Sequence, residues 1–174
     1  MLRLLFSFTL LVFFTGCSTR IITPIQESPP QIEAEVIQEI PQESNDDQWI
    51  KNALYEEYQK WQTTPYKLGG LGGEGEKGVD CSSLIQQIYK NAFGIALPRT
   101  TISQVEKGRV INKEDTKVGD LVFFKTGYNK RHAGIIIEEG KFIHSSQKYG
   151  VIISQLSNPY WKNSYWQSRR ILPE

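Results

Sequence analysis

The stretch DCSSLIQQIYKNAFG, residues 80–94, decides the fold of this chain. Its apolar side chains recur at steps of three and four residues, which predicts a helix with one buried face. Asp80 is a favourable N-cap residue, and Gly94 stands where a C-cap glycine is expected. The residues predicted on the buried face are Leu84, Ile85, Ile88, Tyr89 and Ala92.

Cys81 falls at the first position of this helix. A helix N-terminus carries partial positive charge and unpaired N–H groups, which favour an anion. The thiol, whose ordinary pKa is roughly 8.5, is therefore predicted to be biased toward the reactive thiolate. The same N–H groups are suited to hold the oxyanion of a tetrahedral intermediate. A buried structural cysteine is the alternative, but a helix start after the glycine-rich loop at residues 69–75 favours an accessible nucleophile.

The regions on either side of this helix predict an α+β domain. Upstream, apolar residues recur at helical spacing after Asp46-Asp47, and that helix ends by Thr63-Thr64-Pro65. Downstream, a short helix is predicted within residues 101–107, and the apolar pattern then changes to that of strands. The expected fold has N-terminal helices packed on a small antiparallel sheet. The predicted strands are residues 120–124, 133–137, 141–145 and 151–154.

The chain contains two histidines, His132 and His144, and both fall in or beside predicted strands. Pairing Ile137 with Lys141 across a tight turn at residues 138–140 places His132 opposite His144 or within two residues of it. The β-carbons of cross-strand neighbours lie about 4.5–5.5 Å apart, so one imidazole ring is predicted to orient the other.

Cys81, His132 and His144 together follow the logic of a cysteine-protease triad. His132 would accept the thiol proton and later donate a proton to the leaving amine. His144 would hydrogen-bond the far nitrogen of His132 and fix its tautomer. An alternative uses the same three side chains as zinc ligands, although the sequence has no short-spaced Cys/His pair typical of such sites.

The first 46 residues are predicted to be a targeting segment followed by a tether. Residues 4–14 form an apolar stretch behind Arg3 that is too short to span a bilayer and is typical of a signal peptide. Phe14-Thr15-Gly16-Cys17 resembles a bacterial lipobox, so residues 1–16 are predicted to be a lipoprotein signal peptide and Cys17 the lipidated residue. Residues 17–46 are rich in Pro, Glu and Gln and are expected to form a disordered tether.

This leader predicts an exported protein that is anchored to a membrane through its lipid. Ser18 after Cys17 favours the outer membrane, facing the periplasm. Lipidation leaves Cys81 as a lone thiol, which indicates reactivity in an exported protein. The alternatives are an uncleaved hydrophobic anchor and a Cys17–Cys81 disulfide.

Residues 47–174 are predicted to form one catalytic domain, because a length of 174 residues suits a single domain. The net charge of +1, without any block of five or six like charges, gives no argument for nucleic acid as a partner. The glycine-rich loop is too irregular for a phosphate-binding fingerprint. We therefore expect neither a cofactor nor a metal.

Six short motifs follow one another between residues 66 and 146. They are Tyr66-Lys67-Leu68-Gly69-Gly70, Val79-Asp80-Cys81-Ser82-Ser83, Leu97-Pro98-Arg99-Thr100 with Gln104 a little later, Gly119-Asp120-Leu121-Val122-Phe123-Phe124, His132-Ala133-Gly134-Ile135 and Phe142-Ile143-His144-Ser145-Ser146. In this order and spacing they resemble the NlpC family of cell-wall cysteine peptidases, over about residues 49–172.

The resemblance implies a papain-like cysteine peptidase fold and the activity of a peptidoglycan hydrolase. Such an enzyme is a thiol endopeptidase that cleaves an amide bond in cell-wall stem peptides or cross-links. Cys81 is implied as nucleophile, His132 as base and His144 as the third polar residue. The residues implied to hold substrate or the oxyanion are Tyr66, Asp80 and Ser82.

Peptidoglycan stem peptides are thus the expected partners, and the involvement of a regulatory protein is left open. A non-catalytic peptidoglycan-binding lipoprotein and acyl transfer to an amine instead of water remain as alternatives. Arg99 is expected either to brace a loop through an ion pair or to contact substrate. Trp161, Tyr165 and Trp166 are expected to pack against the first helix rather than to bind glycan.

Overall fold

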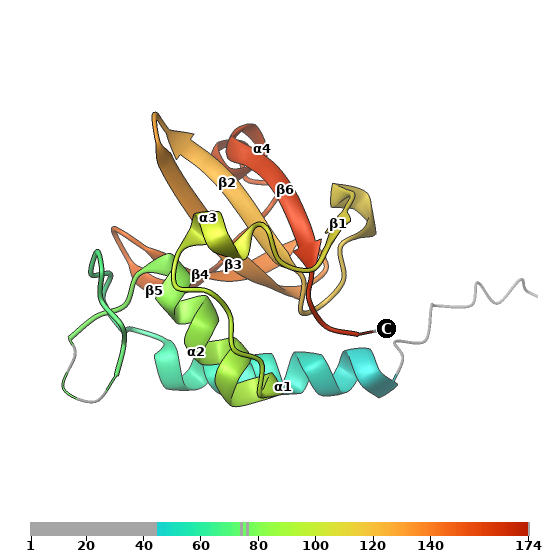
Figure 1. The fold of residues 1–174 in the computed structure, drawn as a ribbon, viewed down its shortest axis with the longest axis horizontal. Helices are drawn as coiled ribbons and strands as arrows, with labels where there is room; N and C mark the ends of the chain where they lie inside the picture. Colours follow the sequence, from blue (N-terminus) through green and yellow to red (C-terminus); the bar gives the residue numbers. More distant parts are fainter. Residues whose placement is uncertain (1–44, 74, 76, 174) are drawn as a thin grey trace, which may run out of the picture. The chain divides into compact units, whose positions relative to one another are not determined.

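Helices pack on a six-stranded antiparallel sheet in the part of the chain that the computed structural model describes, residues 45–73, 75 and 77–173 (Figure 1). This confirms the predicted α+β class. The elements are α1 (Asn45–Trp61), α2 (Cys81–Phe93), α3 (Thr101–Gln104), β1 (Arg109–Ile111), η1 (Lys113–Asp115), β2 (Leu121–Gly127), β3 (Lys130–Glu138), β4 (Lys141–Ser146), β5 (Gly150–Gln155), α4 (Pro159–Ser164) and β6 (Tyr165–Arg170).

The helix predicted from residues 80–94 is α2, and its caps are as expected. The side chain of Asp80 accepts a hydrogen bond from the backbone N–H of Ser83, and Gly94 ends the helix in the left-handed conformation with φ of 68°. Four of the five residues predicted on its inner face are fully buried, and Ala92 is half-buried. The apolar face of α2 lies against β3 and β4.

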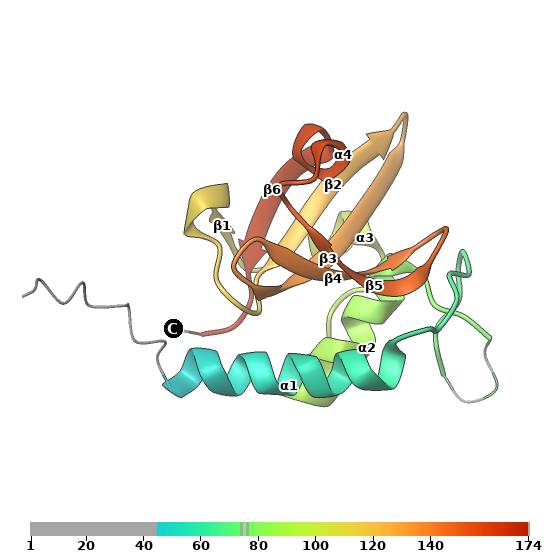
Figure 2. The same cartoon turned by 180° about the vertical axis from the view of Figure 1, so that it is seen from behind.

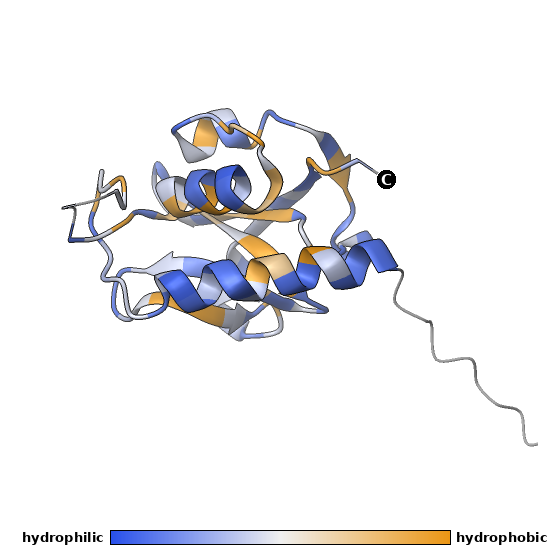
Figure 3. Ribbon diagram, turned by 90° about the horizontal axis from the view of Figure 1, so that it is seen from below, coloured by the Kyte–Doolittle hydropathy of each residue, from blue (hydrophilic) through white to orange (hydrophobic). Residues whose placement is uncertain are grey.

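Helix α1 confirms the upstream prediction, but it buries less apolar surface than its sequence suggests. Trp49 remains 57% exposed, and Figure 3 shows the outward side of α1 as largely hydrophilic. One of its two fully buried side chains is an acid, Glu57. Its carboxylate accepts hydrogen bonds from Asn91 of α2 at 3.1 Å and from Trp61 at 3.3 Å. The bond from Asn91 joins α1 to α2, and Lys60 Nζ, at 2.6 Å from Oε1, forms an ion pair with the same carboxylate.

The sheet has the order β1-β6-β2-β3-β4-β5, and strands β2 to β5 confirm the four predicted strands. Strands β1 and β6 were not predicted. The sequence of β6, YWQSRR, lacks an apolar alternation, yet β6 lies between β1 and β2. Its Arg170 is buried because its guanidinium donates to both carboxylate oxygens of Asp120, at 2.8 and 2.7 Å. A buried ion pair therefore takes the place of apolar packing at this strand.

Strand β2 is buried on both faces, which explains the continuous apolar run at its start. Leu121 and Phe123 face the core shared with α1 and α2. Val122 and Phe124 face a second, smaller cluster on the opposite side, where Trp161 and Tyr165 pack against them. Helix α4, which carries Trp161, lies beside β2 (Figure 2). The expectation that Trp161 and Tyr165 pack against α1 is therefore wrong, because the strand alternation places their partners on the other face.

Strands β3 and β4 form the predicted hairpin. The predicted register holds at Ile135, which pairs with Ile143, but a bulge at the turn brings Glu138 rather than Ile137 opposite Lys141. A β-carbon at Gly134 would lie 2.5 Å from the ring of Phe142 and 2.7 Å from the carbonyl oxygen of residue 143. Glycine at this position therefore lets β4 approach β3 closely beside the two histidines.

The predicted signal peptide, the lipidation site at Cys17 and most of the tether lie outside the described residues. Helix α1 already includes Asn45 and Asp46, which the sequence assigned to the tether. None of the helices in residues 45–73 and 77–173 combines the length and the apolar character that a membrane crossing requires.

Candidate active site

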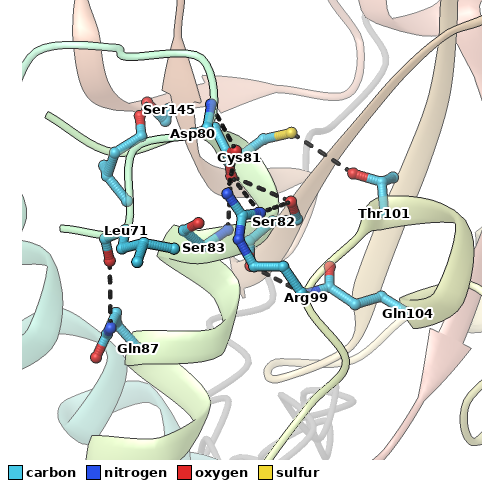
Figure 4. A network of polar contacts seen from close by, with 12 residues as sticks. Leu71, Asp80, Cys81, Ser82, Ser83, Gln87, Arg99, Thr101, Gln104 and Ser145 are labelled. Carbon is cyan, nitrogen blue, oxygen red and sulfur yellow. Dashed lines mark hydrogen bonds and ion pairs between the residues drawn. The ribbon is translucent and has the colours of Figure 1, made fainter.

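The predicted nucleophile stands at the N-terminus of α2 and is nearly enclosed. Cys81 is 7% exposed, and its Sγ lies 3.7 Å from Oγ1 of Thr101, the first residue of α3 (Figure 4). Burial raises the pKa of the Cys81 thiol, and contacts with the Thr101 hydroxyl and the backbone of Ala133 oppose this effect only in part. The thiol is therefore protonated at neutral pH. The predicted bias toward thiolate is not found in this resting arrangement, because burial outweighs the helix N-terminus.

Asp80 and Ser82, which flank the nucleophile, are engaged in a hydrogen-bonded network below it (Figure 4). The carboxylate of Asp80 accepts from Ser83 N at 2.8 Å, from Ser82 Oγ at 3.1 Å and from Arg99 Nη2 at 2.8 Å. Burial opposes the ionisation of Asp80, but the bonds from Arg99 and Ser83 outweigh it and hold its pKa below the ordinary range. Arg99 thus forms the bracing ion pair that was one of its two expected roles.

Gln104 connects the same loop to the helix. Its buried Nε2 donates to the carbonyl oxygens of Ser82 and Pro98, both at 2.9 Å. The ion pair of Arg99 and these two bonds fix the loop that carries Thr101 against the start of α2. The position of the Cys81 thiol therefore depends on the hydrogen bonds and the ion pair that Arg99 and Gln104 form with the start of α2.

Removing the Asp80 carboxylate is expected to destabilise the domain. We expect Asp80→Ala to lower the free energy of unfolding by on the order of 2 kcal/mol, because an N-cap and a charge-assisted bond are both lost. Asp80→Asn keeps a capping oxygen and should cost less. Urea denaturation of both variants measures the difference, and equal losses would contradict the assignment of Asp80 as the cap.

The two histidines lie in direct contact, as their strand positions predicted. His132 Nε2 is 3.0 Å from His144 Nδ1, and His144 Nε2 is 2.9 Å from Ser154 Oγ on β5. Each neutral imidazole carries one N–H, so a proton on His132 Nε2 requires His144 to be protonated at Nε2 and to donate to Ser154. This arrangement leaves Nδ1 of His132 with a free lone pair. It is the tautomer that a general base requires.

Trp161 covers the histidine pair from the α4 side. Its ring stacks on His132 with centroids 5.2 Å apart and an interplanar angle of 25°, and it meets His144 edge-on at 4.9 Å. Burial lowers the pKa of His132 from 6.5 to about 4. Burial and the charge of His132 lower the pKa of His144 to about 3. Both rings are therefore neutral at neutral pH, so the lone pair on His132 Nδ1 is unprotonated, and the same burial makes this imidazole a weaker base.

The stability of the domain is expected to decline below about pH 6.5. The two folded-state pKa values lie below 6.5, so the unfolded chain binds protons that the folded chain excludes. Stability is complete above the ordinary pKa and is lost as the pH falls toward about 4. Between pH 7 and 5.5 we expect the free energy of unfolding to drop by about 2 kcal/mol.

Urea denaturation at these two pH values measures this loss, while ordinary Asp and Glu side chains stay largely ionised in both states. The chain has only these two histidines, so His132→Gln should remove about half of the pH dependence. A stability that is unchanged between pH 7 and 5.5 would contradict the neutral pair.

Cys81, His132 and His144 open onto one groove of about 640 Å³. Tyr66 lines this groove, and burial raises the pKa of its hydroxyl, which therefore remains a proton donor. Asp80 and Ser82 lie beneath the groove and do not line it. Within the described residues no hydrogen bond joins Cys81 to His132, so thiol and base share the groove without an ion pair. The described residues also contain no group of three or more His, Cys, Asp or Glu placed to bind a metal, so the zinc alternative gains no support.

Comparison with known proteins identifies the family. The model of the NlpC/P60 family matches residues 63–170, more than half of the chain, including Cys81 and both histidines. The chain belongs to the NlpC/P60 family. This confirms the resemblance that the six sequence motifs carry.

Two similar proteins carry names that describe an endopeptidase. A Haemophilus influenzae protein named "Probable endopeptidase" is 45% identical over 120 residues, which cover 68% of this chain and 73% of that protein. The Escherichia coli K12 murein DD-endopeptidase MepS/murein LD-carboxypeptidase is 40% identical over 123 residues, covering 71% of this chain and 64% of that protein. A solved Staphylococcus aureus structure, described as similar to lipoprotein, NLP/P60 family, has a TM-score of 0.64 at 31% identity and covers 78% of this chain and 45% of that one.

Three residues of the site escaped the sequence reasoning. Thr101 contacts the thiol, Ser154 ends the imidazole chain, and Trp161 stacks on the base. Trp161 stood out in the sequence as a large aromatic residue near the C-terminus. Its contact with the histidines could not be predicted, because it depends on β6 pairing with β2 and on α4 packing beside them. Thr101 and Ser154 carry no local signal, because their roles arise from contacts between distant segments.

Proposed function

We propose that this chain is a peptidoglycan hydrolase, a thiol endopeptidase that cleaves an amide bond in cell-wall stem peptides or cross-links. The observation that carries the proposal is the neutral His132–His144 pair, joined at 3.0 Å, in one groove with a helix-start cysteine. Membership of the NlpC/P60 family and the endopeptidase names of the relatives support it.

The reaction begins when substrate enters the groove and the Cys81 thiol turns from Thr101 toward His132. His132 accepts the thiol proton at Nδ1, and Sγ attacks the carbonyl carbon of the scissile amide. The imidazolium then donates that proton to the leaving amine as the C–N bond breaks. Water attacks the resulting thioester and releases the acid product, with the proton returning to Sγ. His144 stays hydrogen-bonded to Nε2 of His132 throughout and donates its own N–H to Ser154.

The oxyanion of each tetrahedral intermediate needs hydrogen-bond donors. Backbone N–H groups at the start of α2, beginning with that of Cys81, are suited to this role. The protonated hydroxyl of Tyr66 is a second donor in the groove. Asp80 and Ser82 support the oxyanion site from below, since their side chains hold the first turn of α2 and the Arg99 loop in place.

Digestion of purified peptidoglycan by the whole chain, with products read by mass spectrometry, tests this function. New peptide fragments with a free carboxylate and a free amine at the cleaved bond are expected. Products joined to an added amine would instead indicate acyl transfer. Retention on peptidoglycan without any new product would indicate the non-catalytic binding protein.

We also propose that the protein is exported and attached to the outer membrane, facing the periplasm, through a lipid on Cys17. The signal-peptide pattern of residues 1–16 and the sequence Phe14-Thr15-Gly16-Cys17 support this. Labelling of growing cells with radioactive palmitate should mark the wild-type protein and not Cys17→Ala. Labelled protein confined to the inner membrane would contradict the outer-membrane location.

A further inference from the structure

The groove around the proposed catalytic residues carries an unbalanced charge. Its lining includes three cationic side chains, Lys130, Arg131 and Lys148, and no Asp or Glu among the described residues. We refer to these three residues as the basic rim. The whole chain has a net charge of only +1, so the basic rim concentrates positive charge at one place.

The basic rim is built from two hairpin turns. Lys130 begins β3 directly after the β2–β3 turn, and Lys148 lies in the turn between β4 and β5. Both turns lie at the same end of the sheet as the N-terminus of α2, on the left in Figure 1 and on the right in Figure 2. The two exposed lysines are thus held on the two hairpins that carry His132 and His144.

No member of the basic rim forms an ion pair with a carboxylate in the described part of the chain. Lys148 instead lies over the ring of its neighbour Tyr149, at 4.9 Å from the ring centroid. The guanidinium of Arg131 lies 5.4 Å from the centroid of Trp166, and its buried Nε has no hydrogen-bond partner. Three cations without anions, one with an unsatisfied donor, favour an anionic ligand in this groove.

We propose that the basic rim selects stem peptides whose carboxylates are free over those whose carboxylates are amidated. This inference rests on the proposed function, because it assigns the substrate class of the same groove. In a stem peptide, a γ-linked glutamate keeps its α-carboxylate, and the chain end carries a further carboxylate. The lysine side chains would pair with these groups on either side of the scissile amide and hold the amide over Cys81.

Binding to the whole chain carrying Cys81→Ala tests the proposal without depending on catalysis. The probes are a cross-linked stem-peptide dimer with free carboxylates and the same dimer with its carboxylates amidated, each titrated by calorimetry at 50 and 500 mM salt. At low salt we expect the free acid to bind about tenfold more tightly, and high salt should remove most of this preference. Replacing Lys130 and Lys148 together by Gln should reduce the preference severalfold.

Lys107→Gln is the matched control, because Lys107 is exposed and does not line the groove. This control should keep the full preference for the free acid. Equal binding of the two dimers, no binding of either, or a preference that survives the double lysine substitution would overturn the proposal. A preference for the free acid in binding, combined with no cleavage by the wild-type chain, would support the basic rim and contradict the endopeptidase.

Discussion

Cys81→Ala is expected to reduce the rate of peptidoglycan cleavage by about 10⁴-fold or more. The reason is that the thioester cannot form without Sγ, and the described structure offers no second thiol, since Cys81 is its free cysteine. His132 would still be present but would have no nucleophile to activate. Release of soluble fragments from purified peptidoglycan, followed over time by mass spectrometry, measures this loss.

The fold should survive this substitution. Alanine removes one sulfur atom and its contact with Thr101, so the free energy of unfolding should change by about 1 kcal/mol or less. Cys81→Ser provides the matched variant, because it keeps a similar shape but offers a much weaker nucleophile. Cleavage at the wild-type rate by either variant would disprove the role of Cys81, whereas loss of cooperative unfolding would leave the Ser variant as the test.

His132→Ala is expected to produce the second largest loss, about 10²–10⁴-fold, because general acid–base catalysis contributes that much. The thiol pKa is raised by burial, so Cys81 depends on a base to lose its proton. A higher pH should restore part of the activity of His132→Ala, since hydroxide then removes the proton directly. The rate as a function of pH between 6 and 9 measures this rescue.

His144→Ala should cost less, about ten- to hundredfold, because His144 orients the base and does not transfer the proton to substrate. His144→Asn provides the comparison, since an amide can still accept or donate toward His132 Nε2. Equal losses for His132→Ala and His144→Ala on one substrate would contradict the division of roles between the two histidines.

Most of the site was predictable because its signals are local. The helix that begins at Cys81 follows from apolar spacing, the Asp80 cap and Gly94, and all three lie within one segment. The histidine contact follows from one short hairpin, in which a register error of one residue at Lys141 did not separate the rings. Short-range patterns therefore indicated Cys81 as the proposed nucleophile and His132 as the proposed base without knowledge of the tertiary structure.

The rest of the site depends on segments that are distant in sequence. Strand β6 lies inside the sheet, next to the edge strand β1, although its residues are largely polar, because Arg170 forms an ion pair with Asp120. Trp161 reaches the histidines because α4, between β5 and β6, packs on the face of the sheet that carries Val122 and Phe124. The protonation state of Cys81 was also mispredicted, since the sequence indicates a helix N-terminus but not the burial that Thr101 and β3 impose.

The enclosure of Cys81 has a consequence for its chemical lifetime. Peroxides and disulfides react with thiolates, and a protonated thiol that is 7% exposed offers them little to attack. We therefore expect the burial of Cys81 beside Thr101 to slow the formation of sulfenic acid and of mixed disulfides with small thiols in the resting enzyme. We expect substrate, by drawing the sulfur out toward His132, to be what makes the enzyme vulnerable to oxidants. Such an enzyme would lose activity through oxidation of Cys81 mainly during turnover and not during storage.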